Sequence, residues 1–486
     1  MNLQVFEICS IVIVLSALFG YINVKVLKLP NTIGLMIVAI CFTGFLFASK
    51  MYTNVFIDFA ENLITQVDFP KVLLEIMLGF LLFAGAMHTN FDQLRVQRWP
   101  VIVFSTLGVL ASTFICAILT FFIFGAIGIQ TEFIHCLLFG ALISPTDPIA
   151  VLGILKQAGV PKKLETKIVG ESLFNDGVGV VVFLTIFGIA TGGSHPGEHG
   201  AEHGAVLARN SAAVVTQVAF NQEENVTSET AQATPVAEPS THVTDILSES
   251  ADAEPMSTQV FDVVKLFGQE VLGGILLGLV LGYVTFLLLR SIDDYEIEVL
   301  ITLACVMGGY SLAMAWHLSA PLAIVVAGLI VGNDTVRGTA MSKQTEMYVN
   351  RFWELLDILL NAVLFVLIGL ELLVLNITQE YLIAACIAIV IVLVSRFLSL
   401  LIPVRCFAKK LDFVPHTTTI MTWGGLRGGI SIALALTLTA DLNRELFLTV
   451  TYGVVIFSII VQGLTVGKLA KKLIGAEAME QPTTDH

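Results

Sequence analysis

Charged residues are scarce in this sequence. They make up 13% of its 486 residues, hydrophobic residues make up 56%, and the mean hydropathy is +0.86. A water-soluble domain carries about a quarter of its residues charged, so this chain could not cover a soluble surface and a soluble globular protein is excluded. The net charge of −14 is concentrated in residues 195–262 and indicates no charged partner. We expect no nucleic-acid partner.

The first residues do not have the pattern of a cleavable signal peptide, and the cysteines do not have paired spacing. The first ten residues, MNLQVFEICS, have no positive region and no small-residue cleavage site, so we expect them to enter the first membrane span. The seven cysteines show no metal-ligand or paired spacing, and we expect them to be small buried hydrophobic residues. They are Cys9, Cys41, Cys116, Cys136, Cys305, Cys386 and Cys406.

Long apolar runs are what the sequence has in abundance. Runs of about 18 residues or more predict a polytopic all-α membrane protein. Thirteen transmembrane helices are predicted at 4–22, 31–49, 71–88, 100–125, 132–155, 168–190, 263–289, 296–313, 317–334, 353–374, 380–404, 416–440 and 446–466.

The basic residues of the connecting segments predict the orientation. With the N-terminus outside, 18 of the 25 Lys and Arg residues fall in cytoplasmic segments and 5 in outer segments. Arg396 and Arg427 are the other two, and both lie inside spans. Cytoplasmic loops carry an excess of Lys and Arg. We therefore expect a multi-pass protein of the cell (inner) membrane with its C-terminus in the cytoplasm.

Residues 141–180 place carboxylates inside two successive spans. In the fifth span Pro145 and Pro148 bracket Thr146 and Asp147, and each proline disfavours helix just before itself. The pattern predicts a broken helix with free carbonyl groups beside a carboxylate. Acidic residues at bilayer depth are costly and indicate function, and secondary transporters build ion sites from such breaks.

The sixth span adds Glu171, Ser172, Asn175 and Asp176 within two helical turns. Burial disfavours a charged carboxylate and a nearby cation favours it, so a buried aspartate can hold either a proton or a metal cation. The hydroxyl groups of Ser172 and Thr146 and the carboxylate of Asp147 are hard oxygen donors that suit Na⁺. We predict a Na⁺ site at Asp176, Ser172 and Thr146.

The twelfth span contains a second set of helix breakers. Four glycines in WGGLRGG, with Arg427 among them, predict a second broken helix. The alternative is that these small residues only pack tightly against a neighbouring helix. Two breaks at matching positions predict inverted repeats whose interrupted helices cross near the midplane. The repeats are residues 1–190 (spans one to six) and 296–466 (spans eight to thirteen), with a linking helix in 263–295 and a cytoplasmic tail at 467–486.

Arg396 is the only charged residue in LIAACIAIVIVLVSRFLSLLIPV, the apolar stretch of the eleventh span. An unpaired arginine at the centre of a span costs about 2.5–3.5 kcal/mol, so we expect a carboxylate partner and name Glu171. This pairing leaves Asp176 free for the ion. Arg427 would set the potential at the second break, facing Asp147 or exposed helix ends.

Three polar positions remain open from sequence. Glu75 begins the third span and either lines an ion path or marks an interface. Asp357 and Asn361, spaced i, i+4 in the tenth span, favour interfacial or helix-packing roles.

Residues 191–262 differ in composition from the rest of the chain. They are rich in Ser, Thr, Glu, Ala and Pro, which predicts a disordered extracytoplasmic loop. His195, His199 and His203 alternate with glutamates, so a metal-binding or pH-sensing role is the alternative to a solvated linker.

At these residues the sequence resembles a known family, the monovalent cation:proton antiporters of the electroneutral NhaP/NHE type, and bacterial Na⁺/H⁺ antiporters in particular. The matching strings run in order over nearly the whole chain outside residues 191–262. They are LLFAGAMHTN, ALISPTDPIAVLGILK, GESLFNDGVGVVVF, HLSAPLAIVVAGLIVGN, FWELLDILLNAVLFVLIGLEL, SRF, WGGLRGGISIALAL and FSIIVQGLTV.

The resemblance implies a transport site at Asn175 and Asp176, where the aspartate binds the cation or the proton. It implies electroneutral exchange, because the electrogenic branch has two acids at this place. Further site positions are implied at Thr146, Asp147, Ser172 and Glu75, and a buried ion pair at Glu171 and Arg396. A homodimer is also implied, in which spans four to six and eleven to thirteen move against a dimerisation domain.

Two other functions use the same residues. A cation channel would line its path with the same acids, although broken helices favour alternating access. An intramembrane aspartyl protease would use Asp147 and Asp176, but the chain lacks a Gly-x-Gly-Asp signature. We expect a transporter and not an enzyme, with no cofactor beyond the transported Na⁺, Li⁺ or K⁺ and H⁺.

Overall fold

A computed structural model describes residues 3–49, 58, 60, 68–89, 91–191, 256–407, 413 and 416–474. Every regular element in these ranges is helical. Within the described ranges, ten helices are long and apolar enough to cross a membrane, and α9 (Phe133–Leu142) and α15 (Ala320–Val331) are shorter apolar helices. The predicted all-α polytopic fold is confirmed.

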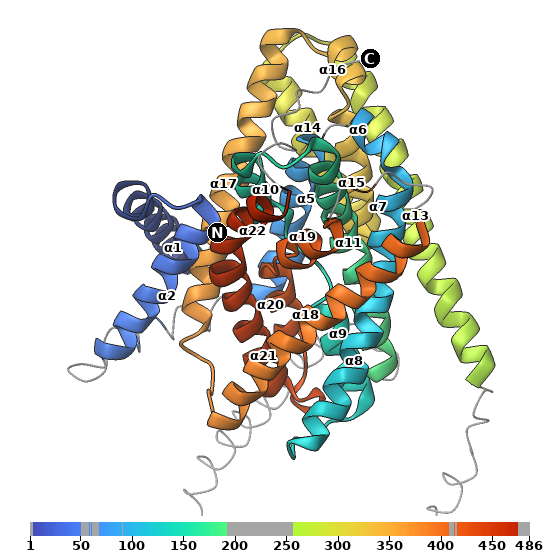
Figure 1. Ribbon diagram of the computed structural model, residues 1–486. Coiled ribbons are helices and arrows are strands. Elements are labelled where there is room, and N and C mark those ends of the chain that lie inside the picture. Colours follow the sequence, from blue (N-terminus) through green and yellow to red (C-terminus); the bar gives the residue numbers. More distant parts are fainter. Residues whose placement is uncertain are drawn as a thin grey trace, which may run out of the picture. The chain divides into compact units, whose positions relative to one another are not determined.

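Each of the thirteen predicted spans corresponds to one helix or to a set of consecutive helices (Figure 1). In the first half these are α1 (Leu3–Ile22) with η1 (Asn23–Leu27), α2 (Asn31–Ser49), α4 (Phe69–Lys71) with η2 (Val72–Met77) and α5 (Leu78–Met87), α7 (Arg98–Val103) with η3 (Phe104–Gly108) and α8 (Val109–Ala126), α9 with α10 (Pro148–Ala158), and α11 (Lys162–Ala190). A short helix, α6 (Phe91–Val96), precedes α7.

The second half follows the same plan. It contains α13 (Met256–Arg290), α14 (Tyr295–Ala315), α15, α17 (Lys343–Glu371), α18 (Gln379–Phe407), α19 (Thr417–Gly424) with α20 (Gly429–Leu436), and α21 (Arg444–Phe457) with η5 (Ser458–Gln462) and α22 (Gly463–Ile474). Two short helices lie between spans, α16 (Asp334–Ala340) and η4 (Ala440–Leu442).

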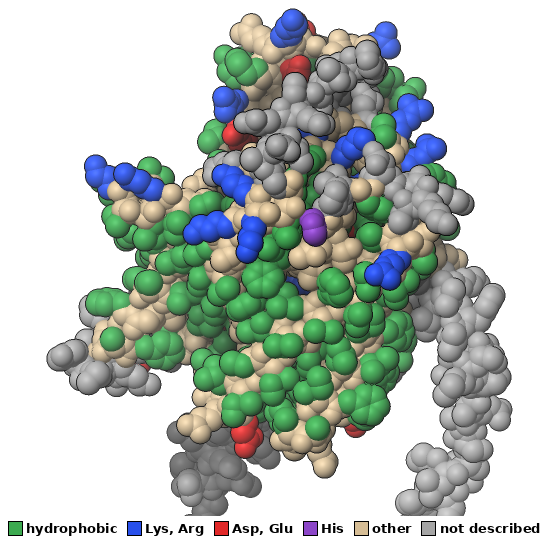
Figure 2. All heavy atoms as spheres, in the orientation of Figure 1, with side chains coloured by type: hydrophobic (Ala, Val, Ile, Leu, Met, Phe, Trp, Pro, Cys, Tyr) green, Lys and Arg blue, Asp and Glu red, His purple; other side chains and the backbone are tan. Residues whose placement is uncertain are grey.

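Large apolar side chains cover the outer face of the helices. Figure 2 shows a wide hydrophobic belt, with most Lys and Arg side chains above it. Cys116, Cys136 and Cys305 are buried as predicted. The prediction was wrong for Cys9, Cys41, Cys386 and Cys406, which are exposed. In a membrane protein an apolar residue is equally at home in the core and against lipid, so hydrophobicity alone does not predict burial.

Among the described residues, two hydrophobic clusters connect many of the helices. One joins residues of η3, α10, α11, α18, α19 and α22, including Phe104, Leu155, Ile420 and Val466. The other joins α5, α13, α14, α15, α16 and α17 around Trp353, whose Nε1 donates to Thr302 Oγ1 (3.0 Å). The first cluster draws on spans four to six and eleven to thirteen, and the second on spans three and seven to ten.

Two spans are interrupted, and the interruptions meet. The fifth span is helical in α9 and α10 and not helical at Pro145–Asp147 between them. The twelfth is helical in α19 and α20 and open over Gly425–Gly428. The Asp147 backbone N–H donates to the Leu426 carbonyl (2.8 Å), which joins the two breaks. The predicted crossing of two broken helices is therefore present (Figure 1).

Residues 187–266 form a second compact unit, separate from the body made of residues 1–186 and 267–486. Only its two helical ends, in α11 and α13, are among the described residues. The predicted loop 191–262, with its histidines and glutamates, lies outside the described residues apart from those ends, as does 475–486 of the predicted tail. Those predictions stay open.

Gly179 of α11 brings the sixth span against the first break. A Cβ at Gly179 would lie 2.5 Å from Cγ of Pro145, a separation that real Cβ atoms do not tolerate. The proline ring is stiff and is fixed within the break, so it cannot turn aside as a flexible side chain would.

We predict that Gly179→Ala lowers the melting temperature of the purified protein, because one of the two segments must shift. Gly188→Ala, on the same helix, is the control. Among the described residues nothing lies within 4 Å of a Cβ at Gly188, so this change should keep or raise the melting temperature through helix propensity. Equal melting temperatures for the two variants would contradict the close contact.

Candidate functional site

Arg427 lies in the second helix break and joins it to the first. Its Nη1 donates to the carbonyl groups of Ser144 (2.8 Å) and Pro145 (3.0 Å), which the first break leaves without helical partners. Its own backbone N–H donates to Ser458 Oγ (2.9 Å), at the start of the π-helical turn η5. One buried side chain thus satisfies the free carbonyls of the other span, as membrane depth requires.

Asp147 lies at the N-terminus of α20. A Cβ on Gly428, the residue that precedes this helix, would lie 3.1 Å from Asp147 Oδ2. The first backbone N–H groups of a helix carry partial positive charge and favour a carboxylate. The second broken helix therefore stabilises the charge of an aspartate that belongs to the first.

Asn175 connects the sixth span to the first break. Its Nδ2 donates to Thr146 Oγ1 (2.8 Å) and to Glu171 Oε1 (3.2 Å), and its Oδ1 accepts from the Thr146 backbone N–H (3.2 Å). The hydroxyl groups of Thr146 and Ser172 lie 2.9 Å apart. All four residues are buried. This network fixes the non-helical segment before Asp147 and turns its polar groups toward α11.

Glu171 and Arg396 form an ion pair in the interior. Arg396 Nη2 lies 2.6 Å from Glu171 Oε2, and both side chains are buried. Because Asn175 donates to the other oxygen of Glu171, both oxygens of this carboxylate have a donor. The pair connects α18 to α11 directly behind the break.

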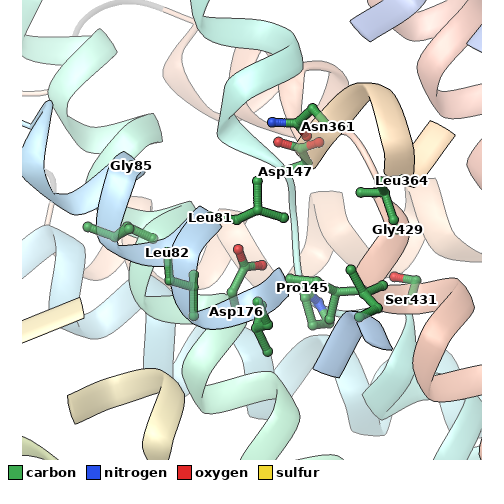
Figure 3. A pocket seen from close by; sticks show the side chains of 15 residues that line it. Leu81, Leu82, Gly85, Pro145, Asp147, Asp176, Asn361, Leu364, Gly429 and Ser431 are labelled. Atoms are coloured by element: carbon green, nitrogen blue, oxygen red, sulfur yellow. The ribbon is translucent and has the colours of Figure 1, made fainter. Parts of the chain in front are cut away.

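Asp176 and Asp147 face one small cavity. Its volume is about 60 Å³, and its walls come from both breaks, α11, η2, α5 and α17. Figure 3 shows the two carboxylates together with Asn361 and Ser431 around this space. Leucines of the third span close the side beyond Asp176. The cavity is thus an acidic, mostly apolar chamber at the crossing of the two broken helices.

A second, larger cavity leads toward this chamber. It has a volume of about 1100 Å³, and we call it the funnel. Gly85 and Leu173 line both spaces, and Asn361 of the chamber donates to Asp357 of the funnel. The basic residues on its walls belong to segments predicted to be cytoplasmic. They are Lys156, Lys162, Arg337, Lys343 and Arg351.

The carboxylates of the funnel differ in their partners. Three lie within 4 Å of a basic side chain, in the pairs Glu165–Lys156 (3.6 Å), Glu346–Arg337 (3.7 Å) and Glu354–Arg351 (2.8 Å). The fourth, Asp357, has no basic partner within that distance in the part of the chain that the structure describes, and accepts a hydrogen bond from Asn361 Nδ2 (3.0 Å). It also lies within electrostatic range of Asp147.

The structure brings together most of the residues singled out from sequence. Asp147, Asp176, Thr146, Ser172, Asn175, Glu171, Arg396 and Arg427 all lie at the crossing. Within this group only the two aspartates line the chamber. Glu75 lies apart: it sits in η2, its side chain is exposed, and neither cavity is lined by it.

Three residues of the site were not recognised from sequence. Asp357 and Asn361 were interpreted as interfacial or packing residues, although two polar residues one turn apart in an apolar span were a usable signal. Ser431 gave no signal, because serine is ordinary in membrane helices.

The fold and site together are those of a secondary transporter, in which broken helices cross beside buried carboxylates. The sequence profile of the family described as sodium/hydrogen exchanger, transmembrane, matches residues 13–220 and 242–472. The chain belongs to this family, which confirms the resemblance found from its motifs.

Individual relatives agree with this assignment. The chain is 41% identical over 486 residues to the Na⁺/H⁺ antiporter NhaP of Pseudomonas aeruginosa, covering 99% of this chain and 100% of the relative. It is 30% identical to the Na⁺/H⁺ antiporter NhaH of Halobacillus aidingensis, covering 92% and 93%. Its fold resembles the sodium proton antiporter MjNhaP1 of Methanocaldococcus jannaschii, with a TM-score of 0.65 at 18% identity and coverage of 97% and 100%.

We predict that Arg396→Met strongly destabilises the protein, because it leaves Glu171 charged and unpaired in the interior. Breaking a buried pair by removing one partner costs about 3–5 kcal/mol, whereas replacing both partners is often neutral. The double variant Arg396→Met/Glu171→Met should therefore melt closer to the parent than the single variant does.

The control is Arg351→Met, which breaks the exposed pair with Glu354 and should change the melting temperature little. Thermal melts of the four purified proteins decide the matter. If the single Arg396→Met variant melts like the parent, the Glu171–Arg396 ion pair does not stabilise the protein.

Proposed function

We propose that this protein is a secondary active antiporter that exchanges Na⁺, or Li⁺ or K⁺, for H⁺ by alternating access. The observation that carries the proposal is the pair of carboxylates, Asp147 and Asp176, facing one small chamber at the helix crossing. A carboxylate at such a place binds a proton or a cation, and each excludes the other. Competition for Asp176 then makes the two fluxes run in opposite directions.

The charges at the crossing support a one-for-one exchange. Three carboxylates, on Asp147, Glu171 and Asp176, stand against two guanidinium groups, on Arg396 and Arg427. With all five ionised the sum is −1. A single bound proton or a single monovalent cation brings it to zero. Net charge inside a bilayer is costly. The site would therefore change its access from one side of the membrane to the other most readily with one proton or one monovalent cation bound.

The donors around the chamber suit hard monovalent cations. Carboxylate, hydroxyl and carbonyl oxygens are the ligands that such ions prefer. We propose that Asp176 binds the ion, with Asp147 beside it, and that Ser172 and Thr146 contribute oxygens after their mutual hydrogen bond opens. Asn175 and the Glu171–Arg396 pair would hold the first break in position. Glu75 stays a proposed ligand that reaches the ion only in another conformation.

The basic residues of the funnel support its assignment to the cytoplasmic side, since loops rich in Lys and Arg stay inside. The structure would then represent an inward-open state in the cell membrane, with the N-terminus outside. Alternating access would move the cluster of spans four to six and eleven to thirteen against the other cluster. The homodimer implied by the family resemblance also belongs to this proposal.

We predict that Asp176→Asn abolishes Na⁺-driven proton movement in proteoliposomes, because the amide binds neither proton nor cation at the required strength. A fluorescent pH dye reports the response to added Na⁺ or Li⁺. Glu354→Gln, which alters an exposed pair on α17, should behave like the parent. Retained exchange in Asp176→Asn would refute the site.

The same vesicles separate the antiporter from a channel. Exchange by the parent should require an opposing gradient and should not depend on a membrane potential imposed with valinomycin and K⁺. A current that flows without a counter-gradient would favour the channel.

We also predict that Asp357→Asn raises the KM for Na⁺ about three- to tenfold, near 1 kcal/mol, with a similar maximal rate. Asp357 is the funnel carboxylate that has no basic partner within 4 Å among the residues described, so it would concentrate cations next to the chamber. The effect should shrink as impermeant background salt increases, because dissolved ions that enter the funnel screen the charges that line it.

Asp357→Glu should restore the parent KM, and Glu354→Gln, one turn nearer the mouth, serves as the matched control. If both neutral variants raise the KM equally, the effect is one of general surface charge and Asp357 has no special role.

A further inference from the structure

Ser431 is a buried hydroxyl group without a partner. Its side chain is 1% exposed, and among the described residues its Oγ makes no hydrogen bond. An unsatisfied buried polar group costs about 1–3 kcal/mol. Such a group beside a binding site needs an explanation. One explanation is that the hydroxyl group bonds to a ligand when that ligand is bound.

The helix break explains why Ser431 is unpaired. Serine and threonine in membrane helices bond to the carbonyl four residues earlier, and Ser144, Ser395 and Thr422 do so in this protein. For Ser431 that carbonyl belongs to Arg427, in the open segment before α20. The interruption that creates the site therefore also frees this hydroxyl group.

Ser431 points into the chamber that Asp147 and Asp176 share. It lines the cavity, and Figure 3 shows its oxygen directed inward from the side of α20. The chamber measures about 60 Å³, and a cavity needs about 10–15 Å³ to hold one water. It therefore has room for a monovalent cation that keeps some of its water.

We propose that Ser431 Oγ is a specificity-determining ligand, which coordinates the transported cation or its retained water from the second broken helix. This inference rests on the proposed antiport function and extends its donor set across the chamber. The proposed donors on α11 and the first break then meet a hard oxygen from α20. The cation would be bound by both broken helices, and an ion of different size or hydration would lose this contact.

The test compares Ser431→Ala with the parent in proteoliposomes. The KM for Na⁺ and for Li⁺ should rise about three- to tenfold, by the loss of roughly one oxygen contact, while the KM for the larger, more weakly hydrated K⁺ changes less. The melting temperature should be equal or higher, because removing an unsatisfied hydroxyl group relieves its cost. A merely structural serine would give the opposite result, a lower melting temperature with an unchanged ratio of KM values.

Thr449→Val is the matched control. Thr449 Oγ1 is another buried hydroxyl group without a partner among the described residues, and it does not line the chamber. Its removal should leave every KM unchanged. The proposal is overturned if Ser431→Ala keeps the parent KM for Na⁺, or if Thr449→Val raises it equally.

Ser431→Cys provides a second reading that does not depend on the alanine variant. Soft sulfur favours soft cations over hard ones, so this variant should bind Tl⁺ better relative to Na⁺ than the parent does. An unchanged Tl⁺-to-Na⁺ ratio would count against a coordinating role.

Failure of the proposed function would be recognised separately. If the parent itself shows no Na⁺-driven proton movement, the antiport proposal has failed. Binding of ²²Na⁺ to detergent-solubilised parent, Ser431→Ala and Thr449→Val protein would still test Ser431, with weaker binding expected for the alanine variant alone. Equal binding by all three would overturn the inference.

Discussion

The structure depends on satisfying backbone groups where two helices are interrupted inside the membrane. Hydrocarbon offers no hydrogen bonds, so each open carbonyl or N–H at that depth needs a protein partner. Here the partners are exchanged between the breaks: Arg427 serves the carbonyls of Ser144 and Pro145, and Leu426 accepts from Asp147. The site residues lie where these hydrogen bonds join the two breaks.

The same constraint explains why the three acids at the crossing have different roles. Glu171 has a donor on each oxygen, from Arg396 and Asn175, and is held in the protein interior outside the chamber lining. Asp147 rests on the N-terminus of α20, where partial positive charge favours it. Asp176 faces the chamber, and it lies within electrostatic range of Asp147, Glu171 and Arg427. Three carboxylates within a short stretch of space thus have three different environments.

Much of this could be predicted from sequence, because helix breakers and intramembrane charges are rare and local. Pro145, Pro148 and the glycines around Arg427 predicted both breaks, and the unpaired charge of Arg396 pointed to a carboxylate such as Glu171. What sequence could not give was direction. Asp357 and Asn361 have the spacing of an ordinary packing pair, and only the fold turns them toward the acids. Ser431 is distinctive only because position 427, four residues earlier, is not helical. The prediction that all the cysteines are buried was wrong for a related reason. Apolar side chains are equally stable in the protein core and against lipid.

The contacts of Arg427 have a consequence for how the protein tolerates mutation. Its acceptors are main-chain carbonyl groups, and no side-chain replacement at positions 144 or 145 deletes a carbonyl. The two hydrogen bonds that Arg427 makes between the breaks can therefore be deleted only by a substitution at Arg427. A substitution at position 144 or 145 can weaken these two hydrogen bonds only by changing the shape of the break. A single substitution at position 427 removes both hydrogen bonds at once.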